Sequence, residues 1–127
     1  MVTPEIDSAV RKLGLSPRSF RLLPNDEGSV LYQELFAEFV TGADRRWWWE
    51  AFSKPSSSRN FEDGKGFERI VELVPNPEER VWFVVEEDQL PFFPIYEATP
   101  DTIQKVIGEC YAFEYYIIPK SKAWLLC

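Results

Sequence analysis

Histidine is absent from all 127 residues of this sequence. Its absence excludes Ser-His-Asp and Cys-His catalysis, excludes histidine-containing zinc sites and removes the commonest general base near neutral pH. The two cysteines, Cys110 and Cys127, are too far apart in the sequence to form a C-x-x-C pair. The segment Gly64-Lys65-Gly66 lacks the spacing of a phosphate-binding loop. We therefore predict no catalytic residues, no metal site and no cofactor, and we interpret the chain as a protein that is not an enzyme.

Long apolar runs are also missing. No stretch approaches the roughly 20 residues that a membrane-spanning helix requires, and no secretory segment is recognisable. So few cysteines are typical of reduced thiols in a cytoplasm. We expect a soluble, cytoplasmic protein that has no membrane partner.

What the sequence does contain is typical of one globular domain, which we place at residues 1–127. Hydrophobic residues make up 45% of the chain and aromatic residues 16%. Aromatic side chains bury large areas, so a stable core needs neither a disulfide nor a metal ion.

The formal net charge of −7 is unevenly distributed. Residues 1–60 carry eight basic and eight acidic side chains, whereas residues 61–127 carry six basic and thirteen acidic ones. This distribution disfavours nucleic acid as a partner, since its phosphates would be repelled. The acidic half either keeps the protein soluble or meets a basic protein partner. Candidate contacts for such a partner are Glu86, Glu87 and Asp88, and the alternative for these three residues is a solvated turn.

The first half of the chain reads as helices. Thr3, as a cap, opens a helix that Gly14 ends, and a short strand at residues 19–23 follows. A second helix is expected at residues 29–40, with its apolar residues inward. A further helical segment at residues 45–52 precedes a loop that lasts to about residue 66.

The second half reads mainly as strands. Residues 80–86 form the strongest strand, apolar throughout and therefore central, and residues 92–96 form a strand that Pro94 makes either short or an edge. Residues 67–74 fit either a helix or a strand. A helix at residues 100–110 precedes a predicted hairpin of residues 112–118 and 122–126. This β-β-α-β-β half, with the N-terminal helices covering one face of its sheet, predicts an α+β fold with a mainly antiparallel sheet.

Three consecutive tryptophans are the most unusual local feature. On a helix their side chains point about 100° apart, so they cannot all enter one core. We predict that Trp48 packs inward with Phe52, and that Trp47 or Trp49 lies at the surface. Trp47 and Trp49, with Arg45 and Arg46, are then candidates for a partner-binding patch. The alternative is an aromatic layer that only closes the core.

Glu114 lies between aromatic residues in an apolar strand. A buried, isolated carboxylate would be costly, so the simplest expectation is that Glu114 faces solvent or pairs with an arginine. The alternative is a ligand pocket formed by Glu114, Tyr115 and Tyr96.

Several segments resemble a family of small, uncharacterised bacterial proteins. They are Trp48-Trp49-Glu50, residues 81–86, Ile95-Tyr96-Glu97, residues 114–118 and Trp124-Leu125-Leu126-Cys127, and the resemblance covers roughly residues 45–127. It implies a single cytoplasmic domain, similar in size and acidity to the immunity proteins that neutralise toxins. No reaction is assigned to the family, so it implies no catalytic residue.

Three functional hypotheses follow. The leading one is a non-catalytic protein-binding domain, with an immunity-like role as its specific form. The second is a small-molecule-binding or enzymatic domain that uses the carboxylate and tyrosine pocket. The third is a structural homo-oligomer, for example a homodimer, that buries its tryptophans against a second copy.

Overall fold

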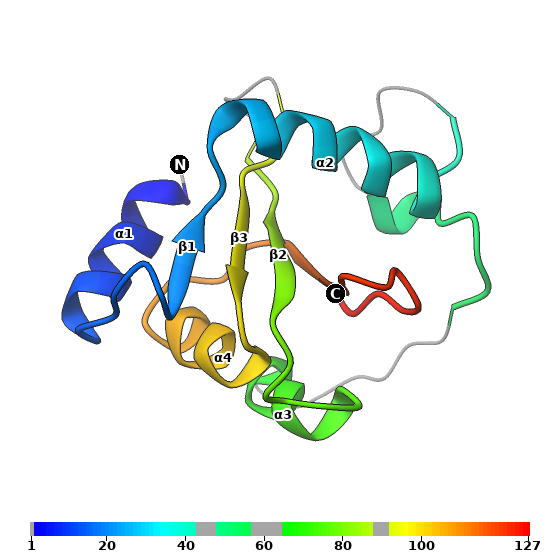
Figure 1. The fold of residues 1–127 in the computed structure, drawn as a ribbon. Helices are drawn as coiled ribbons and strands as arrows, with labels where there is room; N and C mark the ends of the chain where they lie inside the picture. The colour runs from blue at the N-terminus through cyan, green and yellow to red at the C-terminus, as the bar shows by residue number, and fades with distance from the viewer. Residues whose placement is uncertain (1, 43–47, 57–64, 88–91) are drawn as a thin grey trace.

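Four short strands form one antiparallel sheet in the order β1-β3-β2-β4 (Figure 1). The structure is a computed structural model that describes residues 2–42, 48–56, 65–87 and 92–127. The strands are β1 (Phe20–Leu22), β2 (Val81–Val85), β3 (Ile95–Ala98) and β4 (Tyr115–Pro119). The helices are α1 (Thr3–Lys12), α2 (Asn25–Phe39), α3 (Ile70–Leu73) and α4 (Pro100–Gly108), and two 3₁₀-helices are η1 (Trp48–Glu50) and η3 (Gly66–Arg69). The predicted α+β fold is confirmed.

Strand β2 is central, as its continuous apolar sequence predicted. It pairs with β3 on one side and with β4 on the other. Successive side chains of a strand point to opposite faces, and here both faces are covered. Val81, Phe83 and Val85 enter one hydrophobic core, whereas Val84 enters the other.

The two N-terminal helices lie on opposite faces of the sheet, which corrects the expectation that they share one face. Ile6 of α1 packs in the same core as Ile70 of α3 and Ile103 of α4. Leu35 of α2 packs in the second core, with Trp48 of η1. Figure 1 shows α2 lying across one end of the sheet, above the ends of β1 and β3 that are distant from α4. The opposite end of that face is therefore not covered by α2.

Strand β3 begins immediately after Pro94 and is an inner strand, between β1 and β2. Of the two alternatives that Pro94 predicted, a short strand or an edge strand, the structure shows the short strand. Proline has no N–H to donate, but its carbonyl oxygen still accepts a hydrogen bond from the Val85 N–H, at 3.1 Å. Pro94 thus sets the start of β3 but does not prevent β3 from pairing with β1 and β2.

The expected strand at residues 122–126 is reduced to a single bridge. Leu126 exchanges two backbone hydrogen bonds with Ile117, of 2.7 and 2.9 Å. A turn closed by the Lys122 N–H and the Pro119 carbonyl precedes it, and Lys122 has a φ of 60°. The fourth strand of the sheet is β1 instead, from the N-terminal part of the chain.

Helix boundaries differ from the predictions at two starts. Helix α2 begins at Asn25, four residues earlier than expected, directly after Pro24. Thr3 lies inside α1 and does not cap it. The ambiguous residues 67–74 are helical, in η3 and α3. No helix in the described ranges is long and apolar enough to cross a membrane.

Candidate functional site

Glu97, on β3, is surrounded by three cationic side chains. Its Oε1 lies 3.3 Å from Nη2 of Arg80 and 3.5 Å from Nη2 of Arg21, and its Oε2 accepts a hydrogen bond from Nζ of Lys120. We call these four residues the Glu97 cluster. Its members come from β1, from the residue before β2, from β3 and from the residue after β4, so every strand contributes to one charged site.

The strand register explains why the cluster forms. Arg21 is opposite Glu97 in the β1–β3 pair, and Glu97 is opposite Trp82 in the β3–β2 pair. Directly paired residues point to the same face of a sheet. This face is the one that α2 covers at its other end, so the cationic side chains lie where no helix packs over them (Figure 1).

The cluster combines a buried anion with accessible cations. Glu97 is buried, whereas the side chains of Arg80, Arg21 and Lys120 are 37, 40 and 48% exposed. The hydrogen bond from Lys120, followed by that from Arg80, lowers the pKa of Glu97 below its usual value. The carboxylate is therefore ionised at neutral pH, and three cations against one anion leave a net charge of +2.

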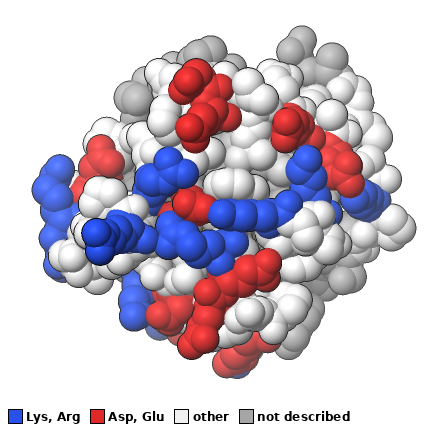
Figure 2. Space-filling view, viewed as in Figure 1, with Lys and Arg blue, Asp and Glu red and all other residues white. Residues whose placement is uncertain are grey.

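Neighbouring groups hold the cations in place. Nη1 of Arg80 donates to the backbone carbonyl of Arg18 at 2.7 Å. Nζ of Lys120 lies over the ring of Trp82, 4.9 Å from its centroid, within the range of a cation–π contact. Figure 2 shows lysine and arginine side chains gathered around a single acidic group in the middle of this face. The surface thus presents ordered cations beside a half-buried aromatic ring.

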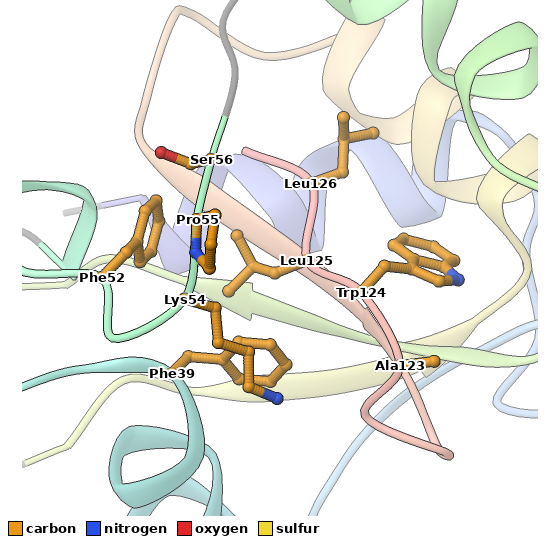
Figure 3. A pocket seen from close by; sticks show the side chains of 9 residues that line it. All are labelled: Phe39, Phe52, Lys54, Pro55, Ser56, Ala123, Trp124, Leu125 and Leu126. Atoms are coloured by element: carbon orange, nitrogen blue, oxygen red, sulfur yellow. The ribbon is translucent and has the colours of Figure 1, made fainter.

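A groove lies between the end of α2 and the C-terminal residues (Figure 3). Its volume is about 370 Å³. Aromatic and aliphatic side chains form most of its walls, and Lys54 and Ser56 add polar groups. The lining residues are Phe39, Phe52, Lys54, Pro55, Ser56, Ala123, Trp124, Leu125 and Leu126.

One wall of the groove is held by hydrogen bonds to α2. Val40 and Phe52 form an antiparallel bridge, and the Ser53 N–H donates to the Phe39 carbonyl at 2.8 Å. Lys54 then places its ammonium 2.6 Å from a carboxylate oxygen of Glu38 and 4.9 Å from the centroid of the Phe39 ring. These contacts fix the position of this wall relative to α2.

The acidic residues after β2 do not form an exposed face. Glu86 is buried, and Glu87 is only 2% exposed. Oε2 of Glu87 accepts hydrogen bonds from the Val2 N–H at 2.7 Å and from the Thr3 N–H at 3.3 Å. A negative charge is favourable at the N-terminus of a helix, so Glu87 caps α1. Their burial leaves Glu86 and Glu87 little surface for contact with a basic partner, and Asp88 lies outside the described residues.

The tryptophan run behaves as its geometry predicted where it is described. Trp48 is fully buried and stacks on Tyr116, whereas Trp49 is 49% exposed. Phe52 also contacts Tyr116, which confirms that Trp48 and Phe52 point to one core. Arg45, Arg46 and Trp47 lie outside the described residues. Trp49 thus remains a candidate contact for a partner.

The residues proposed for a ligand pocket are not brought together around a cavity. Tyr96 is buried in the core against Phe20 and Phe83, and Tyr115 packs on Phe83 and Phe113. Glu114 is exposed, as expected. None of these three residues lines the groove beside the C-terminal residues.

The two cysteine thiols are not activated as nucleophiles. Burial raises the pKa of Cys110 to about 11, and burial followed by the charge of Glu114 raises the pKa of Cys127. The reactive thiolate is therefore disfavoured at neutral pH. The described residues also contain no group of three or more cysteine, aspartate or glutamate side chains that could hold a metal ion.

Sequence reasoning missed the cations of the Glu97 cluster. Arg80 directly precedes the strongest strand and Lys120 directly follows β4, so both lie at strand ends. This signal was present, but it becomes informative only when the strand order places those ends at the same side of the sheet. Glu97, an acidic residue inside an apolar strand, was the second available signal.

Comparison with known proteins places the chain in a family. No curated protein and no solved structure matches it significantly. The model of a family of unknown function, DUF6756, matches residues 2–127, so the likeness first seen over residues 45–127 extends to α1 and α2. The chain belongs to the DUF6756 family.

Proposed function

We propose that this chain is a non-catalytic protein-binding domain and that the Glu97 cluster contacts an acidic segment of its partner. The observation that carries the proposal is the excess of cations. A buried carboxylate needs compensation, and one or two cations provide it. Here three cations surround one carboxylate, and each keeps more than a third of its side chain exposed. The uncompensated charge is available to an anion from outside.

The chemistry of the surface favours a protein partner. Arginine and tryptophan are enriched among the residues that dominate binding energy in protein interfaces, and the cluster combines Arg21 and Arg80 with Trp82. The net charge explains why the partner is not nucleic acid. The whole chain carries −7, so the residues outside this +2 cluster sum to −9. A long polyanion would meet that negative surface, whereas a short acidic segment contacts only the cluster.

This proposal replaces a basic partner by an acidic one. The hypothesis of a basic partner depended on an exposed acidic run at residues 86–88. The described part of that run, Glu86 and Glu87, is buried. The immunity-like role remains the specific biological proposal, supported by the size and acidity of the chain. If it holds, the product of a neighbouring toxin-like reading frame should lose its toxicity when this chain is co-expressed.

The binding proposal is tested by titrating the ¹⁵N-labelled protein with three probes and following its amide signals. The probes are hexaglutamate, hexalysine and a single-stranded oligonucleotide of about twenty nucleotides. Hexaglutamate should bind tightest, should shift the signals of Arg21, Trp82 and Lys120, and should bind more weakly as salt rises. Hexalysine or the oligonucleotide binding more tightly than hexaglutamate would overturn the proposal.

Arg21→Gln is the variant of choice, because Arg21 makes the longest of the three ion pairs and Glu97 keeps its two closer cations. We expect the Kd for hexaglutamate to rise about threefold to tenfold, with thermal stability unchanged to within about 0.5 kcal/mol. Lys12→Gln is the matched control. It removes the same charge from α1, on the other side of the sheet, and should leave the Kd unchanged.

A further inference from the structure

We propose that the groove beside the C-terminal residues accepts one large apolar side chain from the same partner segment that binds the Glu97 cluster. This inference rests on the proposed function and names the partner more closely. The partner would carry acidic residues and, a few residues away, an aromatic or long aliphatic residue.

The two sites are neighbours along the chain. Lys120 belongs to the Glu97 cluster and Ala123 lines the groove; they are three positions apart in the sequence, so their Cα atoms lie at most about 11 Å apart. The intervening turn is fixed on both sides. The Lys122 N–H donates to the Pro119 carbonyl, and Nζ of Lys122 lies 3.6 Å from a carboxylate oxygen of Glu34 on α2. An extended segment rising about 3.3 Å per residue covers this distance in three or four residues.

The groove has the size and lining for a single side chain. A volume of about 370 Å³ is at the lower limit for binding pockets, enough for one aromatic side chain but not for a folded element. Figure 3 shows Leu125 pointing toward Phe52, Pro55 and Phe39, whereas the ring of Trp124 lies on the other side of the C-terminal segment. Lys54 is already paired with Glu38, so its charge does not require a carboxylate from the partner in the groove.

A continuous core connects the two sites. Trp82, which Lys120 covers, and Leu125, which lines the groove, both pack against the hydrophobic cluster that contains Ile118 and Val84. The groove wall and the cationic surface are therefore parts of one rigid face. A segment that binds both gains apolar burial from the groove and charge complementarity from the cluster, and the second contact forms at a high effective concentration.

The test compares two peptides that differ at one position. Each is hexaglutamate extended by two glycines and a final residue, either phenylalanine or serine, with versions carrying the extension at either end. In one of the two orientations, phenylalanine should lower the Kd at least about tenfold relative to serine, because burial of one aromatic side chain is worth at least one decade of affinity. The phenylalanine peptide, but not the serine peptide, should also shift the methyl signals of Leu125, which points into the groove.

Ala123→Trp fills the groove from an exposed lining position. It should abolish the advantage of phenylalanine and leave the Kd of the serine peptide unchanged. Leu73→Trp is the matched control, since Leu73 is an exposed apolar residue of α3 on the other side of the sheet, and it should change neither Kd.

The outcomes separate this inference from the proposed function. Equal affinities of the two peptides in both orientations, with both weakened by Arg21→Gln, would overturn the groove inference alone. An advantage of phenylalanine that survives Ala123→Trp would also overturn it. If Arg21→Gln weakens neither peptide, the proposed function itself fails. Should Ala123→Trp not fold, the Leu125 methyl signals in the unmodified protein decide the question: no shift with the phenylalanine peptide would overturn the groove inference.

Discussion

Replacement of Trp48 and of Trp49 by alanine should have opposite consequences, although the two residues are adjacent in the chain. Trp48 is fully buried between aromatic rings. Its ring centroid lies 5.0 Å from that of Tyr116 at an interplanar angle of 18°, and 5.9 Å from that of Phe93 at 29°. Trp49 is about half exposed.

The expected loss of stability in each variant follows from these surroundings. Truncation of a buried tryptophan to alanine costs about 3–5 kcal/mol, because apolar burial is lost and a cavity remains. Trp48→Ala should therefore lower the free energy of unfolding by this amount. For a chain of this length, each kcal/mol corresponds to roughly 3–4 °C, so the melting temperature should fall by roughly 10–15 °C. Trp49→Ala removes a ring that is already half solvated and should cost less than about 1 kcal/mol.

Urea denaturation of both variants, followed by circular dichroism, measures the two free energies. Sedimentation velocity of the same samples measures self-association, which Trp49→Ala should reduce if the exposed ring contacts a second copy. Equal losses of stability at both positions would refute the reasoning, since they would mean that Trp49 is part of the core. A loss below about 1 kcal/mol for Trp48→Ala would refute it as well.

Three further perturbations test single contacts. Glu87→Gln keeps an acceptor at the start of α1 but removes its charge, so urea denaturation should show a loss of about 1–2 kcal/mol. Burial raises the pKa of Tyr115 to about 12 from 10.0, so its side chain ionises first in the unfolded state and the free energy of unfolding falls as the pH rises from 10 to 12. Tyr115 should contribute about 2 kcal/mol to this fall, beside the contributions of the buried Tyr96 and Tyr116, and Tyr115→Phe should reduce the fall by that amount. Thr99→Ala removes the side chain that caps α4 by accepting from the Thr102 N–H at 3.3 Å, and should cost about 1 kcal/mol in thermal denaturation; an unchanged melting temperature would contradict the capping role.

Local patterns predicted the elements whose structure is decided locally. The apolar run of β2 and the spacing of Ile103, Val106 and Ile107 in α4 each specify burial without reference to the rest of the chain. Thr99 carries its capping partner within its own segment. These elements were predicted correctly for that reason.

The interactions that were not predicted join distant segments. Glu87 looked like part of a solvated acidic turn because its hydrogen-bond donors, Val2 and Thr3, lie at the other end of the sequence. The Glu97 cluster depends on the strand order, which periodicity does not reveal. Pro94 predicted that β3 is either short or at an edge, and only the strand order decides between the two: β3 is short and lies inside the sheet.

The bond between Glu87 and the start of α1 has a consequence for synthesis on the ribosome. Helix α1 leaves the ribosome first, but the carboxylate that neutralises its end is made 84 or more residues later. Likewise β1 finds its only sheet neighbour, β3, after residue 95 has been added. Helix α1 and strand β1 therefore lack these partners until β3 has been translated, so this part of the fold cannot form early in synthesis.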